Sequence, residues 1–220
     1  MSLRNTWKEA DNLDTELGNI IPFSFDKTLG FLTSSPTEVG TGMKASIMLN
    51  LPGLTLANQI STVIKGINKL GLNVNGLYDE NSSYIGNLYQ ISNQSTLGEI
   101  EEQIIERIEN IVYQIVIHEK NARLNLLENK KEYLLNCIGR AYGTMRYSYI
   151  ISEKEALNYL SILRMGIDLK MFSNLDFNIL NDLLISVQNA HLQKITGINL
   201  NSSELDILRA DIIRNKLQAQ

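Results

Sequence analysis

The sequence lacks the residues and segments that define several classes of protein. It has one cysteine, Cys137, so an intramolecular disulfide is excluded, and no Cys or His spacing predicts a zinc site. No apolar run approaches the ~20 residues that a membrane-spanning helix needs. Residues 1–11 contain no apolar segment of the signal-peptide type. We therefore expect a cytoplasmic protein that does not bind a membrane.

Strong positive charge is also absent. The chain has 20 Lys and Arg residues against 24 Asp and Glu residues, which gives a net charge of −4. This balance argues against broad binding to nucleic-acid phosphates. Hydrophobic residues make up 44% of the 220 residues, so a disordered chain is excluded and a hydrophobic core is expected.

The first half of the chain alternates extended and helical patterns. Apolar spacing predicts a helix over residues 54–70, with Gly71 as its C-terminal cap. Extended runs predict strands at residues 30–33, 45–49, 72–78 and 84–91. The pattern indicates an α+β fold in which strands pair through hairpins.

The pattern after Ser95 is helical. Three pairs of residues have the spacing of a helix-starting capping box: Thr96 and Glu99, Ser152 and Glu155, and Ser203 and Asp206. We place a boundary near Leu126, between an α+β domain at residues 1–126 and a helical domain at 127–220. The apolar helical faces are compatible with a homo-oligomer, but they equally fit a core.

Small residues fill the loop from Ser34 to Gly42. Backbone N–H groups of such a loop can bind an anion, but the same residues also fit an ordinary connection, and both interpretations stay open. Ser35 has no neighbouring histidine, which argues against a serine hydrolase. Glu80, in a turn, is either a carboxylate for a cationic substrate or simply solvated.

Three segments in order resemble motifs of the ATP:guanidino phosphotransferases. The run G-F-L-T-S-S-P-T-E-V-G-T-G-M-K-A-S-I from residue 30 resembles G-[YF]-L-T-x-C-P-T-N-x-G-T-x-x-R-A-S-V. Residues 74–80, V-N-G-L-Y-D-E, resemble V-R-G-x-x-G-E, and residues 86–93, G-N-L-Y-Q-I-S-N, resemble G-N-x-[YF]-Q-I-S-N. Trp7 and Asp14 match positions of the family's bacterial branch.

The C-terminal part resembles the helical domain of the bacterial protein-arginine kinases, through residues 140–143, 163–169 and 208–214. The resemblance implies a guanidino-kinase catalytic domain, truncated at its N-terminus, with an antiparallel sheet flanked by helices and an all-helical domain after it. It also implies transfer of the ATP γ-phosphoryl group, with magnesium, to arginine in a protein.

The resemblance assigns candidate site residues. Glu80 and Ser35 fall at catalytic, substrate-binding positions, and no metal-ligating residue is implied. The ATP-binding positions are Lys44, Thr41 and Asn75. Asp206 and Arg209 match a motif, R-D-x-x-R, that binds phosphoarginine on proteins, although its first arginine is replaced by Leu205.

Departures from the family pattern indicate impaired catalysis. Lys44 and Asn75 replace arginines, Ser35 replaces a cysteine, and Glu38 replaces an asparagine. Two further motifs of the family's catalytic domain, N-E-E-D-H and R-x-R, do not occur in the chain. We therefore expect a pseudokinase that binds a protein substrate or a partner kinase chain. The alternatives are an active module completed by a missing N-terminal half, and a decaying gene or fragment.

Overall fold

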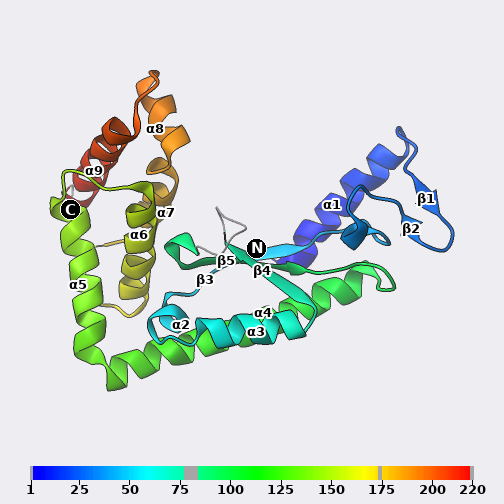
Figure 1. Cartoon of the computed structure of the whole chain (residues 1–220), viewed down its shortest axis with the longest axis horizontal. Coiled ribbons are helices and arrows are strands. Elements are labelled where there is room, and N and C mark those ends of the chain that lie inside the picture. The colour runs from blue at the N-terminus through cyan, green and yellow to red at the C-terminus, as the bar shows by residue number, and fades with distance from the viewer. Residues whose placement is uncertain (1, 77–83, 173–174, 219–220) are drawn as a thin grey trace. The chain divides into compact units, whose positions relative to one another are not determined.

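The computed structural model describes residues 2–76, 84–172 and 175–218. It consists of helices and small antiparallel sheets, so the predicted α+β class is confirmed (Figure 1). The chain forms two compact units. The first contains Met1–Leu49, Gln59–Ser82 and Tyr89–His118, and the second contains Asn50–Asn58, Ser83–Leu88 and Glu119–Gln220. The boundary near Leu126 stays a prediction.

The first unit begins with a helix and a short hairpin. Helix α1 (Leu3–Gly18) has no buried residue, and strands β1 (Phe25–Asp26) and β2 (Gly30–Phe31) pair antiparallel. The one-turn helix η1 (Pro36–Glu38) follows in the loop after β2.

A sheet of β3 (Ser46–Asn50), β5 (Leu88–Asn93) and β4 (Leu72–Gly76), in that order, forms the centre of the first unit. Strands β4 and β5 are antiparallel, with Val74 opposite Ile91. Helix α3 (Ile60–Lys69) contacts β4. Apolar side chains of the strands and of helix α4 (Glu101–Asn129) are fully buried, among them Leu72, Ile91, Ile104 and Ile108.

Three sequence predictions in this half need correction. The helix predicted over residues 54–70 is two helices, α2 (Pro52–Leu56) and α3, because Asn58 between them has a φ of 58°. The strand predicted over 84–91 is the one-turn helix η2 (Ile85–Asn87) followed by β5. Thr96 does not cap α4, since its hydroxyl donates to the carbonyl of Val39. Gly71 is confirmed as a left-handed C-terminal residue, with a φ of 76°.

Helices make up most of the second unit: α5 (Lys131–Tyr147), α6 (Glu153–Asp168), α7 (Phe177–Ser186), α8 (Asn189–Thr196) and α9 (Ser202–Gln218). Its main core is formed by α5, α6, α7 and α9, with Met145, Leu163, Leu183 and Ile213 fully buried. The capping box of Ser152 and Glu155 is confirmed. The one predicted at Ser203 and Asp206 is wrong, because Asn201 and Glu204 exchange these hydrogen bonds two residues earlier.

Two short segments from the first half of the sequence pack into the second unit. The side-chain amide of Asn50 donates to the carbonyl of Gly86 and to the hydroxyl of Ser161, each at 2.8 Å. The backbone N–H of Gly86 donates to the side chain of Asn158 on α6 at 2.7 Å. The carboxylate of Glu119, which is 4% exposed, accepts from two backbone N–H groups of α2, those of Gly53 and Leu54.

The searched part of the chain, which leaves out residues 77–83 and a few others, contains no helix long and apolar enough to span a membrane.

Candidate functional site

The loop that carries Ser35 is closed by its own hydrogen bonds. Ser35 precedes η1, its hydroxyl lies 2.9 Å from that of Thr37, and its carbonyl accepts from Thr33. The backbone N–H groups of Glu38, Gly40 and Gly42 donate to carbonyls of the protein. These three N–H groups are therefore already hydrogen-bonded within the protein. They are not available as donors to a bound anion.

The loop lies against the chain that leads into α4. Gly40 has a φ of 120°, and a Cβ at this position would lie 2.9 Å from the carbonyl oxygen of Thr96. The carbonyl of Val39 accepts from the Thr96 hydroxyl at 2.8 Å. Only glycine fits this close approach of two backbones, so the loop is held in one place.

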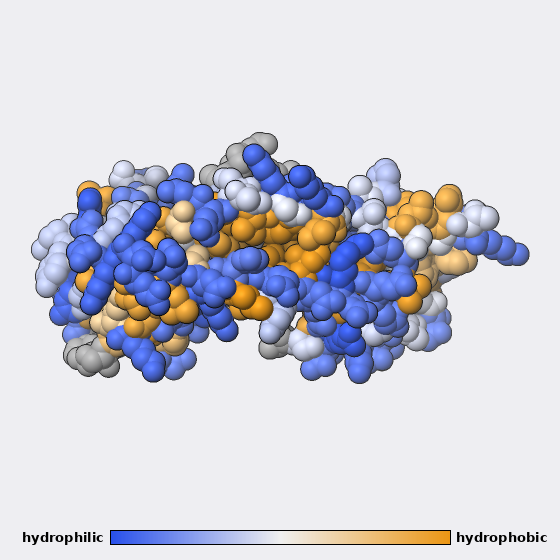
Figure 2. Space-filling view, turned by 90° about the horizontal axis from the view of Figure 1, so that it is seen from below, coloured by the Kyte–Doolittle hydropathy of each residue, from blue (hydrophilic) through white to orange (hydrophobic). Residues whose placement is uncertain are grey.

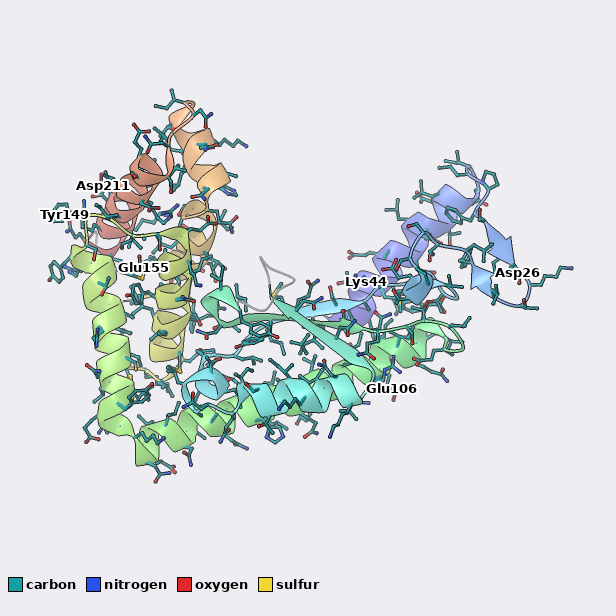
Figure 3. The ribbon with its side chains drawn as sticks, viewed as in Figure 1. Asp26, Lys44, Glu106, Tyr149, Glu155 and Asp211 are labelled. Carbon is teal, nitrogen blue, oxygen red and sulfur yellow. The ribbon has the colours of Figure 1, made fainter. Side chains whose placement is uncertain are left out.

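Lys44 supplies the positive charge at the end of the loop. Its ammonium nitrogen lies 3.8 Å from a carboxylate oxygen of Glu38, and the two side chains are 59% and 29% exposed. Figure 3 marks the position of Lys44. An exposed pair of this kind is weak, worth ~0–1 kcal/mol. It nevertheless places a negative charge beside the cation that an anionic ligand would have to use. Thr41, in the same loop, accepts with its hydroxyl from the backbone N–H of Met43.

Asn75 lies on the same face of the sheet as Ser46, the second residue after Lys44. It is an exposed residue of β4, directly opposite Gln90 of β5. The side-chain amide of Gln90 donates in turn to the hydroxyl of Ser46, at the start of β3. The fold thus arranges Asn75, Gln90 and Ser46 across three strands, and this row is uncharged.

Arginine is absent from the sequence between Arg4 and Arg107. Within the first unit, Arg4 pairs with Glu109 at 3.2 Å and Arg107 pairs with Glu99 at 2.6 Å. Both guanidinium groups are therefore already paired with carboxylates. Glu80, the remaining candidate of this half, lies outside the described residues.

Arg209 and Asp206 come together in the second unit, with Arg209 in the interior. The Arg209 side chain has no exposed surface, and it forms an ion pair with Asp206 at 2.5 Å. Its other N–H groups donate to the carbonyls of Val187 and Ile151, at 2.7 Å each, and to the side chain of Asn189. In this arrangement the guanidinium joins α9 to the segments before α6 and α8, and it offers no exposed N–H to a ligand.

A cavity of about 470 Å³ lies beside Thr41 in the first unit. Trp7, Asp11 and Asp14 of α1 line it, together with residues of the loop. Sequence reasoning noted Trp7 and Asp14 only as family matches and missed Asp11. The sequence signal that could have found Asp11 is the spacing of positions 7, 10, 11 and 14, because residues at these intervals lie on one face of a helix.

Comparison with known proteins assigns both parts of the chain. Residues 1–122 match the family model described as ATP:guanido phosphotransferase, C-terminal catalytic domain, and residues 131–220 match that of the protein-arginine kinase McsB C-terminal domain.

Two curated relatives match almost the whole chain. A protein-arginine kinase of Pelotomaculum thermopropionicum is 41% identical over 98% of this chain and 61% of its own length. One from a Geobacillus species is 43% identical over 100% of this chain and 61% of its own. The chain thus spans about three fifths of the length of these relatives.

Among solved structures, the substrate-free duplicated taurocyamine kinase from Schistosoma mansoni gives a TM-score of 0.46 at 23% identity. The match covers 63% of this chain and 20% of that one.

Proposed function

Because the chain belongs to the ATP:guanido phosphotransferase family, we propose that it is a catalytically impaired relative of the protein-arginine kinases that acts by binding or regulating a protein. The curated relatives carry the name protein-arginine kinase. The partner we infer is a protein substrate or an intact kinase chain of the same family.

The observation that carries this proposal is the position of Glu38 beside Lys44, 3.8 Å from its ammonium group. Phosphoryl transfer spreads negative charge over the transferring group, so catalysis depends on positioned cations. Lys44 is a single ammonium group with a carboxylate next to it. A lysine also lacks the planar donor fork with which arginine binds phosphate through two hydrogen bonds.

Two features of the described residues argue against binding of magnesium ATP. No group of three His, Cys, Asp or Glu side chains in the searched residues could hold a metal ion. Asn75 brings no charge to the sheet face, and Arg4 and Arg107 are paired with carboxylates elsewhere. ATP and magnesium are therefore cofactors that the family implies, and this proposal includes no step that uses them.

Residues 131–220 match a domain named for protein-arginine kinases, and we infer that the second unit takes part in binding the partner. Asp206 is partly exposed on α9, whereas Arg209 is enclosed. Binding of phosphoarginine at this motif remains a prediction. It would require Arg209 to leave at least one of its present acceptors.

The test combines a binding and an activity measurement. The protein is titrated with magnesium ATP in a calorimeter, and it is incubated with magnesium ATP and an arginine-rich protein before phosphoarginine is measured by mass spectrometry. We expect no binding heat and no phosphoarginine. The matched control is the variant S35C/E38N/K44R/N75R, which restores the family residues and should gain nucleotide affinity.

The runner-up function is an active kinase module completed by a further segment. It is motivated by the three-fifths share of the relatives' length that the chain covers. A second arm therefore adds the N-terminal two fifths of a relative as a separate polypeptide. Phosphoarginine in this arm, or micromolar binding of ATP by the unmodified chain, would overturn the proposal of impaired catalysis.

A further inference from the structure

The cavity beside α1 combines an apolar wall with acidic groups. Its volume is about 470 Å³, and it is lined by residues of α1, by segments 22–24, 31–33 and 41–43, and by Glu101. Trp7, Phe23 and Phe31 are among its apolar lining residues. The rings of Phe23 and Phe31 meet edge to face, with centroids 6.1 Å apart.

The charge of the cavity has one sign. Asp11, Asp14 and Glu101 line it, and its described lining contains no lysine, arginine or histidine. These carboxylates do not converge on one point, because no group of three acidic, His or Cys side chains in the searched residues could hold a metal ion. The arrangement therefore favours positive charges spread along an extended ligand over a single cation.

Exposed apolar side chains continue from the cavity along the hairpin. Ile20 is 78% exposed and Phe25 is 60% exposed, and Ile21, Leu29 and Leu32 are also exposed. The hydropathy view shows apolar surface over β1 and β2, at the right-hand end (Figure 2). Apolar patches of this kind are uncommon on a surface that faces only water, and they mark binding sites. The exposed side chains are spread over the chain from Ile20 to Leu32, which favours an extended ligand.

We propose that this cavity and the adjoining hairpin surface dock a basic, amphipathic polypeptide segment of a partner protein. The inference rests on the proposed binding function and names the chemistry of the partner. The apolar side chains of the segment would cover the surface around Phe25 and Ile20. Its lysine or arginine side chains would enter the cavity.

The lining suits such a side chain along its whole length. The aliphatic stem of an arginine or lysine packs on apolar surface while its charged head reaches polar groups. A guanidinium or ammonium group over the face of Trp7 is attracted to the ring, and tryptophan is the best of the aromatic residues in this role. Asp11 and Asp14, one helical turn apart on α1, then pair with the positive charges.

Trp7 makes the proposal directly measurable, since it is the only tryptophan of the sequence. The unmodified protein is titrated with a basic amphipathic helical peptide while its tryptophan fluorescence is followed at low and at physiological salt. A peptide with the same apolar residues and glutamates in place of the basic residues is the control ligand. We expect a saturable change with the basic peptide only, weaker at the higher salt.

Two double variants with the same change of net charge distinguish binding by the cavity carboxylates from a general effect of charge on the helix. D11N/D14N removes carboxylates that line the cavity, and E9Q/E16Q removes two exposed ones on the same helix that do not line it. We expect D11N/D14N to weaken binding by about fivefold and E9Q/E16Q to change it by less than about twofold.

Several results would overturn the proposal. They are equal binding of the acidic peptide, equal loss in both double variants, or no fluorescence change at millimolar peptide. A fluorescence change that follows protein concentration without peptide would assign the surface to a second copy of the chain. Tight binding of the N-terminal two fifths of a relative in competition with the peptide would assign it to that segment. None of these readouts depends on phosphoarginine formation, so failure here is distinct from failure of the proposed function.

Discussion

Glu38 holds a carboxylate oxygen 3.8 Å from the ammonium nitrogen of Lys44, the residue that stands where the family motif has an arginine. Replacing Glu38 by glutamine removes the neighbouring negative charge and leaves the loop hydrogen bonds of its backbone in place. We expect the affinity of E38Q for inorganic triphosphate to rise by about two- to fivefold, because repulsion between exposed charges is modest. NMR chemical-shift titration at millimolar triphosphate, which detects binding too weak to give a calorimetric signal, measures this change.

The matched control for Glu38 is E102Q, which removes an exposed carboxylate on α4 of the same unit. It should leave triphosphate affinity unchanged. Equal affinities of E38Q and the unmodified chain would show that the pair does not limit anion binding.

Arg209 should be a main determinant of the stability of the second unit. R209M leaves the carbonyls of Val187 and Ile151 without their donor and Asp206 without its cation. Breaking a buried, hydrogen-bonded charge pair costs about 3–5 kcal/mol of unfolding free energy. R140M, at an exposed position of α5, should cost less than about 0.5 kcal/mol. Urea unfolding of both variants tests this expectation, and a small loss in R209M would contradict it.

Two glycines should respond to alanine in opposite ways. Gly30 has a φ of 79°, and its Cβ would clash with the carbonyl of Gly40, so G30A should unfold more easily. Gly66 lies in α3, and a Cβ at this position would point into open space. G66A should therefore stabilise the protein by about 0.5–1 kcal/mol, because alanine is the better helix former. Thermal unfolding measures both, and a stabilised G30A would refute the clash.

Asp26 should titrate below its ordinary range. Its carboxylate accepts from the hydroxyl and the backbone N–H of Thr28 and from the N–H of Leu29. These hydrogen bonds lower the pKa of Asp26 from 3.8, and the bond from the Thr28 hydroxyl has the largest effect. The resulting stabilisation of the turn is complete above pH 3.8 and is lost as the pH falls through the lowered pKa.

T28V removes the hydroxyl donor, so the pKa of Asp26 should move back toward 3.8. Carboxyl NMR titration measures both proteins. A pKa of Asp26 that is the same in T28V and in the unmodified chain would contradict the role of Thr28.

Local sequence signals predicted several elements correctly and failed where distant residues decide. The box of Ser152 and Glu155 depends on neighbours three positions apart, and it forms as predicted. Thr96 has the same local signature, but its hydroxyl donates instead to the carbonyl of Val39, which lies 57 positions away in the sequence. Asn58 divides the predicted helix over 54–70 because α2 is fixed by Glu119, 65 and 66 positions later.

The candidate site shows the same limit. Motif resemblance placed Lys44, Thr41 and Ser35 in one loop, which follows from their closeness in sequence. It could not indicate that the Arg209 side chain is enclosed, since three of its four acceptors lie 20 to 58 positions away. The cavity around Trp7 likewise needs loop segments whose approach no spacing rule describes.

The bonds from Asn50 and Gly86 to Ser161 and Asn158 limit how this protein can be recombined with its relatives. A chimera that exchanges everything after residue 130 would keep native residues 50–58 and 83–88 but confront them with a foreign α6. The hydrogen-bonding partners, Asn50 with Ser161 and Gly86 with Asn158, would then have to be transferred together. Compatible splice points should therefore be chosen by these pairs rather than by the junction of the two matched family regions.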